Sequence, residues 1–394
     1  MSRLRGRIVA AVVVLLAGVG MLPSSTPASA SKQVVFSPYQ RGPAPDRLDL
    51  GAPLGPFTYE SISRSALDTP IGMSGGTIYY PSEEAGTFGT IAIAPGWTNT
   101  QSAVAWYGPL LASHGFVVMT IDTNSRVTDL PRDRATQLLL ALDYLVSDAN
   151  PVRSKVDPDR LAVAGYSMGG GGAIEATSRR PSIKASVPLT PWHTTKTFEG
   201  IRTPTLVVGA QNDSTASVAS HAIPLYEGLP AELPKAYAEL REKGHSLPTS
   251  HNPVVAKLTV SWMKRFVDTD YRFDAVLCPP PNDTTTFSDY RSTCPYTPDA
   301  DGDTVSDAFD SCPDTGPLPE PVAVVPGQGP ERFSAAADGR FVAATGVDSG
   351  VTMLDTGGCS AAQIKAQLGL REPPNRFGVT REVLDQWITT LHAA

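Results

Sequence analysis

The sequence predicts an α/β fold, in which a mostly parallel sheet is covered by helices on both faces. Three observations predict it. Short apolar runs alternate with segments of helical periodicity over about 260 residues. The apolar runs are almost unbroken, as in strands that are buried on both faces. A glycine-rich turn also joins one of these runs directly to a helix, and alternation of this kind is typical of parallel sheets with crossover helices.

Each expected element follows from its local pattern. The strands are apolar runs bounded by turn residues: 91–94, 116–121, 160–164, 205–209 and 236–240. The helices have apolar residues at helical spacing: 106–113, 133–148, 169–176, 218–227 and 257–266. In residues 133–148, for example, Leu138, Leu142 and Leu145 share one face.

The first thirty residues have the pattern of a secretory signal peptide. Three arginines precede the apolar run Ile8–Leu22, and Ala28-Ser29-Ala30 is a small-x-small cleavage site. The run is shorter than the roughly 20 residues that a membrane-spanning helix needs. We therefore expect residues 1–30 to be removed, the mature chain to begin near Ser31, and the protein to be secreted.

The charge distribution argues against two kinds of partner. The chain has a formal net charge of −7, and removing the three arginines of the signal peptide makes it −10. Residues 297–394 hold 14 acidic and 6 basic residues. Because no basic patch is visible, we expect no nucleic-acid partner. An acidic surface does not favour anionic lipid headgroups, and we expect no stable membrane insertion. We also expect the protein to be a monomer.

A nucleophile motif follows the strand at 160–164. Gly165-Tyr166-Ser167-Met168-Gly169 has the Gly-x-Ser-x-Gly spacing of a sharp strand-to-helix turn. The flanking glycines allow strand and helix to pass closely, and the turn raises the serine hydroxyl above the sheet. The sequence therefore predicts that Ser167 is a catalytic nucleophile.

A serine hydroxyl needs a base and an acid that orients the base. In α/β-hydrolases the acid and the histidine follow the serine in that order. Asp213 lies just beyond the strand at 205–209, and His245 lies in the loop after the strand at 236–240. We expect these two residues to complete the triad, with His251 as the alternative base. Asp122 precedes the serine, and we interpret it as structural.

The oxyanion of the reaction needs two N–H donors. One is expected from Met168, the residue after the nucleophile. The other is expected from Trp97, in the loop after the strand at 91–94, with its ring as a wall of the substrate site. This chemistry needs no cofactor.

The composition changes after Cys294. Proline, glycine and aspartate crowd residues 295–329, and strand–helix alternation does not return. We expect a catalytic domain over residues 31–296 and an acidic, irregular or helical appendage over 297–394, with helices starting at Ser360 and at Thr380. The four cysteines of an exported chain predict two disulfides, for which three pairings are possible. Cys278 with Cys294 would close a short loop, and Cys312 with Cys359 would staple the appendage.

From Ser37 to Tyr296 the chain resembles the actinobacterial cutinase and polyester-hydrolase family. The similar stretches are Ser37–Pro43, Gly75–Pro81, Gly96–Ser102, Ala112–Val118, Ile121–Asn124, Thr190–His193 and Arg291–Pro295. The resemblance implies an α/β-hydrolase without a lid, whose shallow groove takes cutin, acylglycerols or synthetic polyesters.

The same resemblance assigns residues. It implies Ser167, Asp213 and His245 as the triad, Trp97 and Met168 as oxyanion donors, Trp192 as an aromatic clamp on the acyl side, and a disulfide between Cys278 and Cys294. Thr215 stands where the family has an isoleucine that would pack on an aromatic substrate, and Trp97 stands where tyrosine or phenylalanine is usual.

The leading hypothesis is thus a secreted, cutinase-like serine esterase. Within enzymes, the alternative is a triacylglycerol lipase or a short-chain carboxylesterase with little polymer activity. A different class of protein, a calcium-stabilised surface-binding protein with an inactive hydrolase body, would lack a complete triad.

The start of the appendage resembles a thrombospondin type 3 calcium repeat. The carboxylates that carry the resemblance are Asp299, Asp301, Asp303, Asp307 and Asp310. Carboxylates at alternate positions can converge on Ca²⁺, and Gly302 allows the turn between them. The alternative is a solvated acidic linker.

Overall fold

The computed structural model describes residues 37–198, 200–278, 280–281, 283–296, 299–303, 305, 307, 310–316, 318–322, 331–371 and 376–393. The expected signal peptide, residues 1–30, lies outside this part of the chain. Within it, every helix is too short or too polar to traverse a lipid bilayer.

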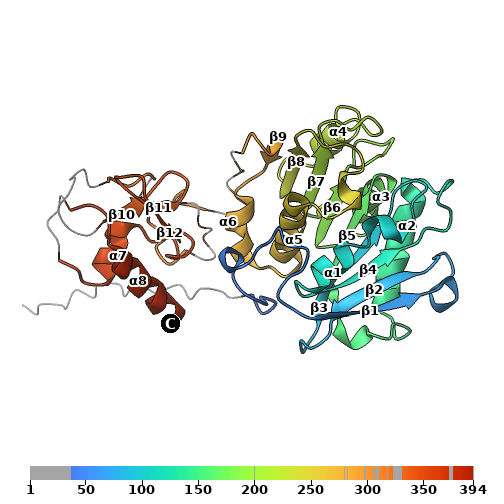
Figure 1. Cartoon of the computed structure of the whole chain (residues 1–394), viewed down its shortest axis with the longest axis horizontal. Helices are drawn as coiled ribbons and strands as arrows, with labels where there is room; N and C mark the ends of the chain where they lie inside the picture. The colour runs from blue at the N-terminus through green and yellow to red at the C-terminus, as the bar shows by residue number, and fades with distance from the viewer. Residues whose placement is uncertain are drawn as a thin grey trace, which may run out of the picture. The chain divides into compact units, whose positions relative to one another are not determined.

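Among the described residues, nine strands form one large sheet (Figure 1). Their order is β1-β2-β4-β3-β5-β6-β7-β8-β9. Strands β4, β3, β5, β6, β7 and β8 run parallel, whereas β1, β2 and β9 are antiparallel to their neighbours. The strands are β1 (Tyr59–Arg64), β2 (Gly76–Pro81), β3 (Phe88–Ala94), β4 (Phe116–Ile121), β5 (Val156–Tyr166), β6 (Ala185–Leu189), β7 (Thr205–Ala210), β8 (Lys235–Leu240) and β9 (Phe287–Ser292). The predicted, mostly parallel α/β fold is confirmed.

Helices cover both faces of this sheet (Figure 1). They are α1 (Tyr107–Ala112), α2 (Pro131–Leu145), α3 (Met168–Arg179), α4 (Ala222–Glu227), α5 (Pro253–Val267) and α6 (Asp274–Leu277), with 3-10 turns at Pro45–Arg47, Ala66–Asp68, Gln101–Val104, Arg153–Lys155, Leu247–Thr249 and Tyr271–Phe273. Successive residues of a strand point to opposite faces. In β3, Ile91 and Ile93 therefore pack with α1 and α5, while Ala92 and Ala94 pack with α2 and α3.

Every strand and helix expected in residues 91–266 is present, but four strands of the large sheet were not predicted. These are β1, β2, β6 and β9. Strand β6 was missed because Ser186 and Pro188 interrupt its apolar run, and proline disfavours a central strand assignment. Helix α4 starts at Ala222 rather than at Val218, because residues 218–221 form a turn before it.

The appendage contains a small sheet that the sequence analysis missed. Its strands are β10 (Phe333–Ala335), β11 (Arg340–Ala343) and β12 (Asp348–Thr352), all antiparallel. They are only three to five residues long, too short to show a clear period of two. The two expected helices are α7 (Ala361–Gln367) and α8 (Arg381–Ala393). Ser360 caps α7 in a capping box with Gln363, as predicted.

The appendage has its own hydrophobic core, which includes Phe341, Met353, Ile364 and Leu384. Both expected disulfides are present. Cys278 pairs with Cys294, and Cys312 pairs with Cys359, whose sulfurs lie among the buried residues of this core.

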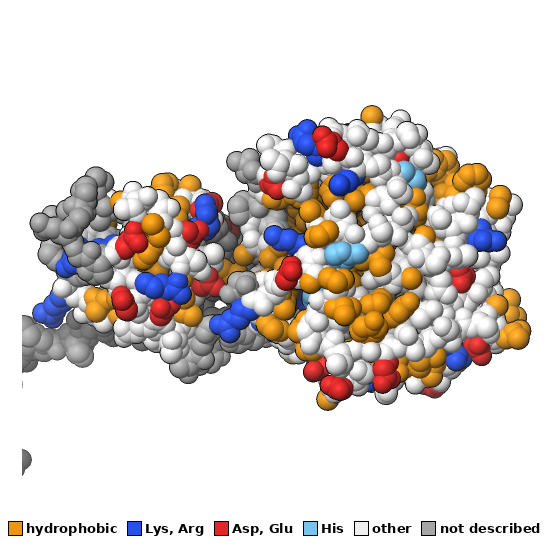
Figure 2. Space-filling model, viewed as in Figure 1, with side chains coloured by type: hydrophobic (Ala, Val, Ile, Leu, Met, Phe, Trp, Pro, Cys, Tyr) orange, Lys and Arg blue, Asp and Glu red, His pale blue; other side chains and the backbone are white. Residues whose placement is uncertain are grey.

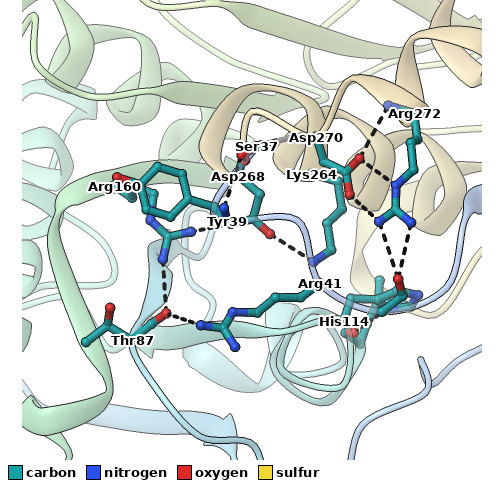
Figure 3. Close-up of polar contacts among 12 residues, drawn as sticks. Ser37, Tyr39, Arg41, Thr87, His114, Arg160, Lys264, Asp268, Asp270 and Arg272 are labelled. Atoms are coloured by element: carbon teal, nitrogen blue, oxygen red, sulfur yellow. Dashed lines mark hydrogen bonds and ion pairs between the residues drawn. The ribbon is translucent and has the colours of Figure 1, made fainter. Parts of the chain in front are cut away.

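A buried ion cluster ties the start of the described chain to the sheet and to α5 (Figure 3). The carboxylate of Asp268, which is 1% exposed, accepts hydrogen bonds from Arg160 Nη1 at 2.6 Å and Lys264 Nζ at 2.8 Å. Ser37 Oγ donates to the backbone oxygen of Asp268 at 2.6 Å, and the Arg160 guanidinium stacks 4.0 Å from the centre of the Tyr39 ring. One carboxylate thus contacts two buried cations, and Arg160 also pairs with Asp157 at 2.8 Å.

Removing the charge of this carboxylate should destabilise the fold strongly. In Asp268→Asn, Lys264 stays buried without its counter-charge and Arg160 is left with Asp157, so we expect the free energy of unfolding to fall by about 3–5 kcal/mol. Urea denaturation of the full chain measures it. Asp143→Asn is the control, because the ion pair of Asp143 with Arg180 is exposed and should contribute less than about 1 kcal/mol. Equal losses in the two variants would contradict this interpretation.

Candidate active site

Ser167 lies in a sharp turn between β5 and α3, as the motif predicted. It is the residue before the first turn of α3 and has φ of 57° and ψ of −117°, an uncommon conformation for a residue with a side chain. A Cβ on Gly165 would lie 2.3 Å from the backbone of Gly169, and a Cβ on Gly169 would lie 2.3 Å from Ala94 O. Only glycine fits at both positions, which explains the Gly-x-Ser-x-Gly pattern.

The structure brings the three predicted triad residues together. His245 Nε2 lies 2.9 Å from Ser167 Oγ, and His245 Nδ1 lies 2.7 Å from Asp213 Oδ2. A carboxylate only accepts hydrogen bonds, so Nδ1 carries the ring proton and Nε2 accepts from the serine hydroxyl. Each side chain comes from the carboxyl end of a different parallel strand: β5, β7 and β8.

The environment of Asp213 favours its ionised form. Burial opposes ionisation, but hydrogen bonds from His245 and from the N–H groups of Ala216 and Thr215 outweigh it, so the pKa of Asp213 is lowered. The two N–H groups hold Oδ1 at 2.7 and 2.9 Å, which leaves Oδ2 directed at His245. The ionised form of Asp213 is therefore favoured, and its orientation is fixed.

The residues predicted to supply oxyanion donors border the same serine. Met168 is the first residue of α3, where N–H groups have no acceptor within the helix. On the other side, a Cβ on Gly96 would lie 3.0 Å from Ser167 Cβ, so the loop that carries Trp97 passes close beside Ser167. Thr98, with φ of 63° and an N–H bond to Arg126 O of 2.8 Å, fixes that loop.

Two tryptophans border the serine on different loops. Trp97 is 52% exposed, and its indole N–H donates to Val127 O at 3.0 Å. Trp192 is half-buried, and its backbone N–H donates to Ser167 O at 2.9 Å. Thr215 is exposed beside the acid. The site is open, with large apolar rings available to a ligand.

The remaining candidate residues lie outside the triad. His251 is exposed, and its ring packs edge-on against Trp106 at 5.4 Å. Asp122 accepts hydrogen bonds from the backbone and side chain of Gln101 at 2.8 and 3.0 Å, consistent with the structural role expected for it.

Sequence reasoning missed the residues behind Trp192. The ring of His221 stacks on the indole, with centroids 5.6 Å apart and planes 28° apart, and the ammonium of Lys196 lies 2.8 Å from His221 Nδ1. No local pattern signals these contacts, because they join two separate segments of the chain, the loop that carries Trp192 and Lys196 and the turn that carries His221.

The predicted calcium ligands are partly clustered. Asp299, Asp301 and Asp303 each place a carboxylate oxygen within 4.8 Å of the others. A Cβ on Gly358 would lie 2.1 Å from Asp310 Oδ1 and 2.8 Å from Asp303 Oδ2, so these two carboxylates also lie close to each other.

Asp307 instead accepts a hydrogen bond from the backbone N–H of Ala300 at 2.7 Å. Asp303 is fully buried, and burial raises its pKa to about 8.

Figure 2 shows the charges of one face. Its apolar side chains gather mainly over the part of the chain that contains the large sheet. Lys and Arg side chains are scattered among the described residues of this face and do not form a band. The expectation that nucleic acid is not a partner stays a prediction.

Comparison with known proteins assigns to a family the part of the chain that contains the large sheet. A family model described as PET hydrolase-like matches residues 33–295. A bis(hydroxyethyl) terephthalate hydrolase of Streptomyces coelicolor is 48% identical over 74% of this chain and 94% of its own length.

Cutinase 2 of Thermobifida cellulosilytica is 50% identical over 66% of this chain and 99% of its own length. Cutinase cut1 of Thermobifida fusca is also 50% identical, over 66% of this chain and 82% of its own length. These matches confirm the resemblance noted in the sequence, and the chain belongs to the PET hydrolase-like family of cutinases and polyester hydrolases.

Proposed function

We propose that this protein is a secreted, cutinase-like serine esterase that hydrolyses carboxylic ester bonds of polymeric or lipid substrates through an acyl-enzyme. The observation that carries the proposal is the hydrogen-bonded chain from Asp213 through His245 to Ser167, at 2.7 and 2.9 Å. The relatives named cutinase and bis(hydroxyethyl) terephthalate hydrolase support ester hydrolysis as the reaction. That the enzyme works as a monomer stays a prediction.

In the acylation step, Ser167 Oγ attacks the ester carbonyl while its proton moves to His245 Nε2. Asp213 stabilises the imidazolium that forms. The N–H groups of Met168 and Trp97 are proposed to bind the negative oxygen of the tetrahedral intermediate. When the intermediate collapses, the ester C–O bond breaks and His245 returns the proton to the alcohol that leaves.

In the deacylation step, water takes the place of the alcohol. His245 removes a proton from the water, whose oxygen attacks the acyl carbonyl, and the proton then passes to Ser167 as the C–Oγ bond breaks. The products are a carboxylic acid and the free enzyme. All proton transfers use groups present in this chain, so the proposed chemistry needs no cofactor.

The open site favours a polymer over a small enclosed ligand. Trp97 is more than half exposed. Trp192 is hydrogen-bonded to the backbone of Ser167, and Thr215 is hydrogen-bonded to Asp213. The alternative remains a triacylglycerol lipase or short-chain carboxylesterase, and hydrolysis of butyrate and palmitate esters compared with release of acid from polyester film distinguishes them. The arginine-rich start, apolar run and cleavage pattern of residues 1–30 support secretion.

For the appendage we propose a Ca²⁺ site with a stabilising role. Asp299, Asp301, Asp303 and Asp310 would supply carboxylate oxygens, which are the ligands that this hard cation prefers. The fit is supported by two orphaned atoms: Asp301 Oδ1 and Asp303 Oδ2 are buried and have no hydrogen-bond partner among the residues that the structure describes. A bound cation would balance carboxylates that are otherwise costly to bury.

Replacing the nucleophile tests the reaction. We expect Ser167→Ala to lower kcat for p-nitrophenyl butyrate by roughly 10⁴-fold or more, because no other group can form the acyl-enzyme. Release of p-nitrophenol measures it. Ser178→Ala, on the same helix but hydrogen-bonded only to Glu175 O at 2.8 Å, should keep near-normal activity. Comparable hydrolysis by Ser167→Ala and the original chain would remove Ser167 from the mechanism.

Thr215 offers a test of the aromatic substrate. Thr215→Ile adds apolar surface beside the acid loop, so we expect KM for bis(2-hydroxyethyl) terephthalate to fall by about 3- to 10-fold. KM for p-nitrophenyl acetate should change little. Thr215→Val, which removes the hydroxyl without lengthening the side chain, is the matched control and should show a smaller fall. An unchanged KM in Thr215→Ile would place Thr215 outside the substrate site.

Calcium should raise the melting temperature of the original chain after treatment with a chelator. Asp303→Asn removes a buried carboxylate with an unpartnered oxygen, so without calcium we expect it to be as stable as the original or more so, and with calcium to gain nothing. Calorimetric titration with CaCl₂ and thermal melts measure both effects. Asp348→Asn, an exposed carboxylate of the same appendage paired with Arg340, should respond to calcium normally. No binding by the original chain would refute the site.

A further inference from the structure

Two apolar side chains on the loop between β1 and β2 lie in solvent. Leu67 is 97% exposed, and Ile71 is as exposed as in an extended chain, at 102%. They are the two most exposed large apolar side chains in the described part of the chain. Single exposed apolar residues are ordinary, whereas apolar side chains that gather on one surface mark a place where a partner binds.

The loop that carries this pair is anchored at both ends. Asp68 Oδ2 accepts hydrogen bonds from Ser65 N at 3.0 Å and from Ser65 Oγ at 2.7 Å, which close a capping box around the 3-10 turn Ala66–Asp68. At the other end of the loop, Met73 is 5% exposed and packs in the core that α2 covers. The two apolar side chains between these anchors are therefore held outward.

The loop lies at the edge of the sheet that carries the active site. Gly76, at the start of β2, pairs with Ile121 at the carboxyl end of β4. In the parallel neighbours, Ala94 of β3 pairs with Gly165 of β5, two residues before the nucleophile. The carboxyl ends of β3, β4 and β5 meet at one edge because these strands are parallel. The antiparallel β2 begins at that edge, and so the loop before it lies there too.

A third loop joins the exposed pair to the substrate site. Asn124, which follows β4, donates through Nδ2 to Gly72 O at 2.7 Å and accepts at Oδ1 from Ser74 Oγ at 3.0 Å. Three residues further on, Val127 is 62% exposed, and its backbone oxygen accepts the indole N–H of Trp97 at 3.0 Å. Apolar side chains are thus exposed on three hydrogen-bonded loops, from the β1–β2 loop to the loop beside the nucleophile.

The charges around the pair favour a neutral partner. The carboxylate of Asp68, next to Leu67, is held by the Ser65 hydroxyl, which lowers the pKa of Asp68, and Arg64 Nη2 lies 3.6 Å from it. The chain as a whole has a formal net charge of −7, which disfavours an anionic lipid surface. A polyester is apolar and carries no charge along its chain, so neither obstacle applies to it.

We propose that Leu67 and Ile71 adsorb the enzyme to the surface of a solid polyester, and that Val127 and Trp97 continue this contact toward the nucleophile. The proposal rests on the proposed function, in which the ester substrate is a polymer. A solid cannot enter a pocket, so the enzyme has to bind the surface with its open site facing the solid. The apolar side chains at the edge that carries the site meet this requirement.

Adsorption without hydrolysis tests the proposal. Full-length chains that carry Ser167→Ala, which leave the film intact, are added to amorphous poly(ethylene terephthalate) film, and the unbound protein is measured. We expect Leu67→Ser and Ile71→Ser each to raise the dissociation constant for the film about 3- to 10-fold, because each removes apolar area that the film would cover. Leu67→Trp, which adds apolar area at the same place, should lower it.

Leu54→Ser is the matched control. Leu54 is 48% exposed, but its loop lies at the opposite edge of the sheet. Its neighbour Gly55 donates from its backbone N–H to Ser113 Oγ at 2.6 Å, and Ser113 precedes the amino end of β4. We therefore expect Leu54→Ser to adsorb to the film as the Ser167→Ala chain does.

Chains that keep Ser167 connect adsorption to activity. With limiting enzyme, Leu67→Ser and Ile71→Ser should lower the release of acid from the film by the same factors. For dissolved p-nitrophenyl butyrate, whose hydrolysis needs no surface, kcat/KM should change less than about 2-fold. Both side chains lie outside the core, so the circular dichroism of these variants should match that of the original chain.

Unchanged adsorption in both serine variants, an equal loss in Leu54→Ser, or an equal loss of hydrolysis in solution would overturn the proposal. Failure of the original chain to hydrolyse both the film and the dissolved ester would instead refute the proposed function. The two failures are distinguishable because adsorption is measured on a chain that lacks the nucleophile.

Discussion

The close passage of β3, β5 and α3 at Ser167 is the constraint on which the site depends. A non-glycine residue at positive φ costs about 1–3 kcal/mol, and it persists only when its surroundings hold it. Here the backbone of Ser167 is held on two sides, by its own N–H bonded to Leu189 O and by the Trp192 N–H bonded to its carbonyl, both at 2.9 Å. At positions 165 and 169 the surrounding backbone leaves no space for a Cβ, so only glycine fits there.

The same passage organises the other groups. Because parallel strands end at one edge of a sheet, the loops after β5, β7 and β8 bring Ser167, Asp213 and His245 within hydrogen-bond distance. The Ser167–Leu189 bond also fixes the end of β6, and the chain that follows β6 carries Trp192. Ser167 and Trp192 are thus positioned by one set of backbone contacts.

The sequence was sufficient for the elements with strong local signals. The glycine spacing predicted the turn at Ser167, the chain order predicted Asp213 and His245, and the capping box predicted the start of α7. Contacts between distant segments could not be predicted in this way. His221 lies far along the chain from Trp192 and Lys196, and β6 carries a proline where a central strand is not expected. The short strands of the appendage lack a readable period, and its disulfide was one of three pairings that the sequence left open.

The proposed reaction requires Ser167 to be an activated nucleophile. The most direct measurement is covalent labelling of the full chain with a fluorophosphonate, followed by intact mass and peptide mapping, with Asp213→Asn labelled in parallel. We expect one adduct per chain, on Ser167, formed much more slowly in Asp213→Asn because the proton of His245 is no longer held on Nδ1. No adduct, an adduct on another serine, or equal labelling rates in the two proteins would contradict it.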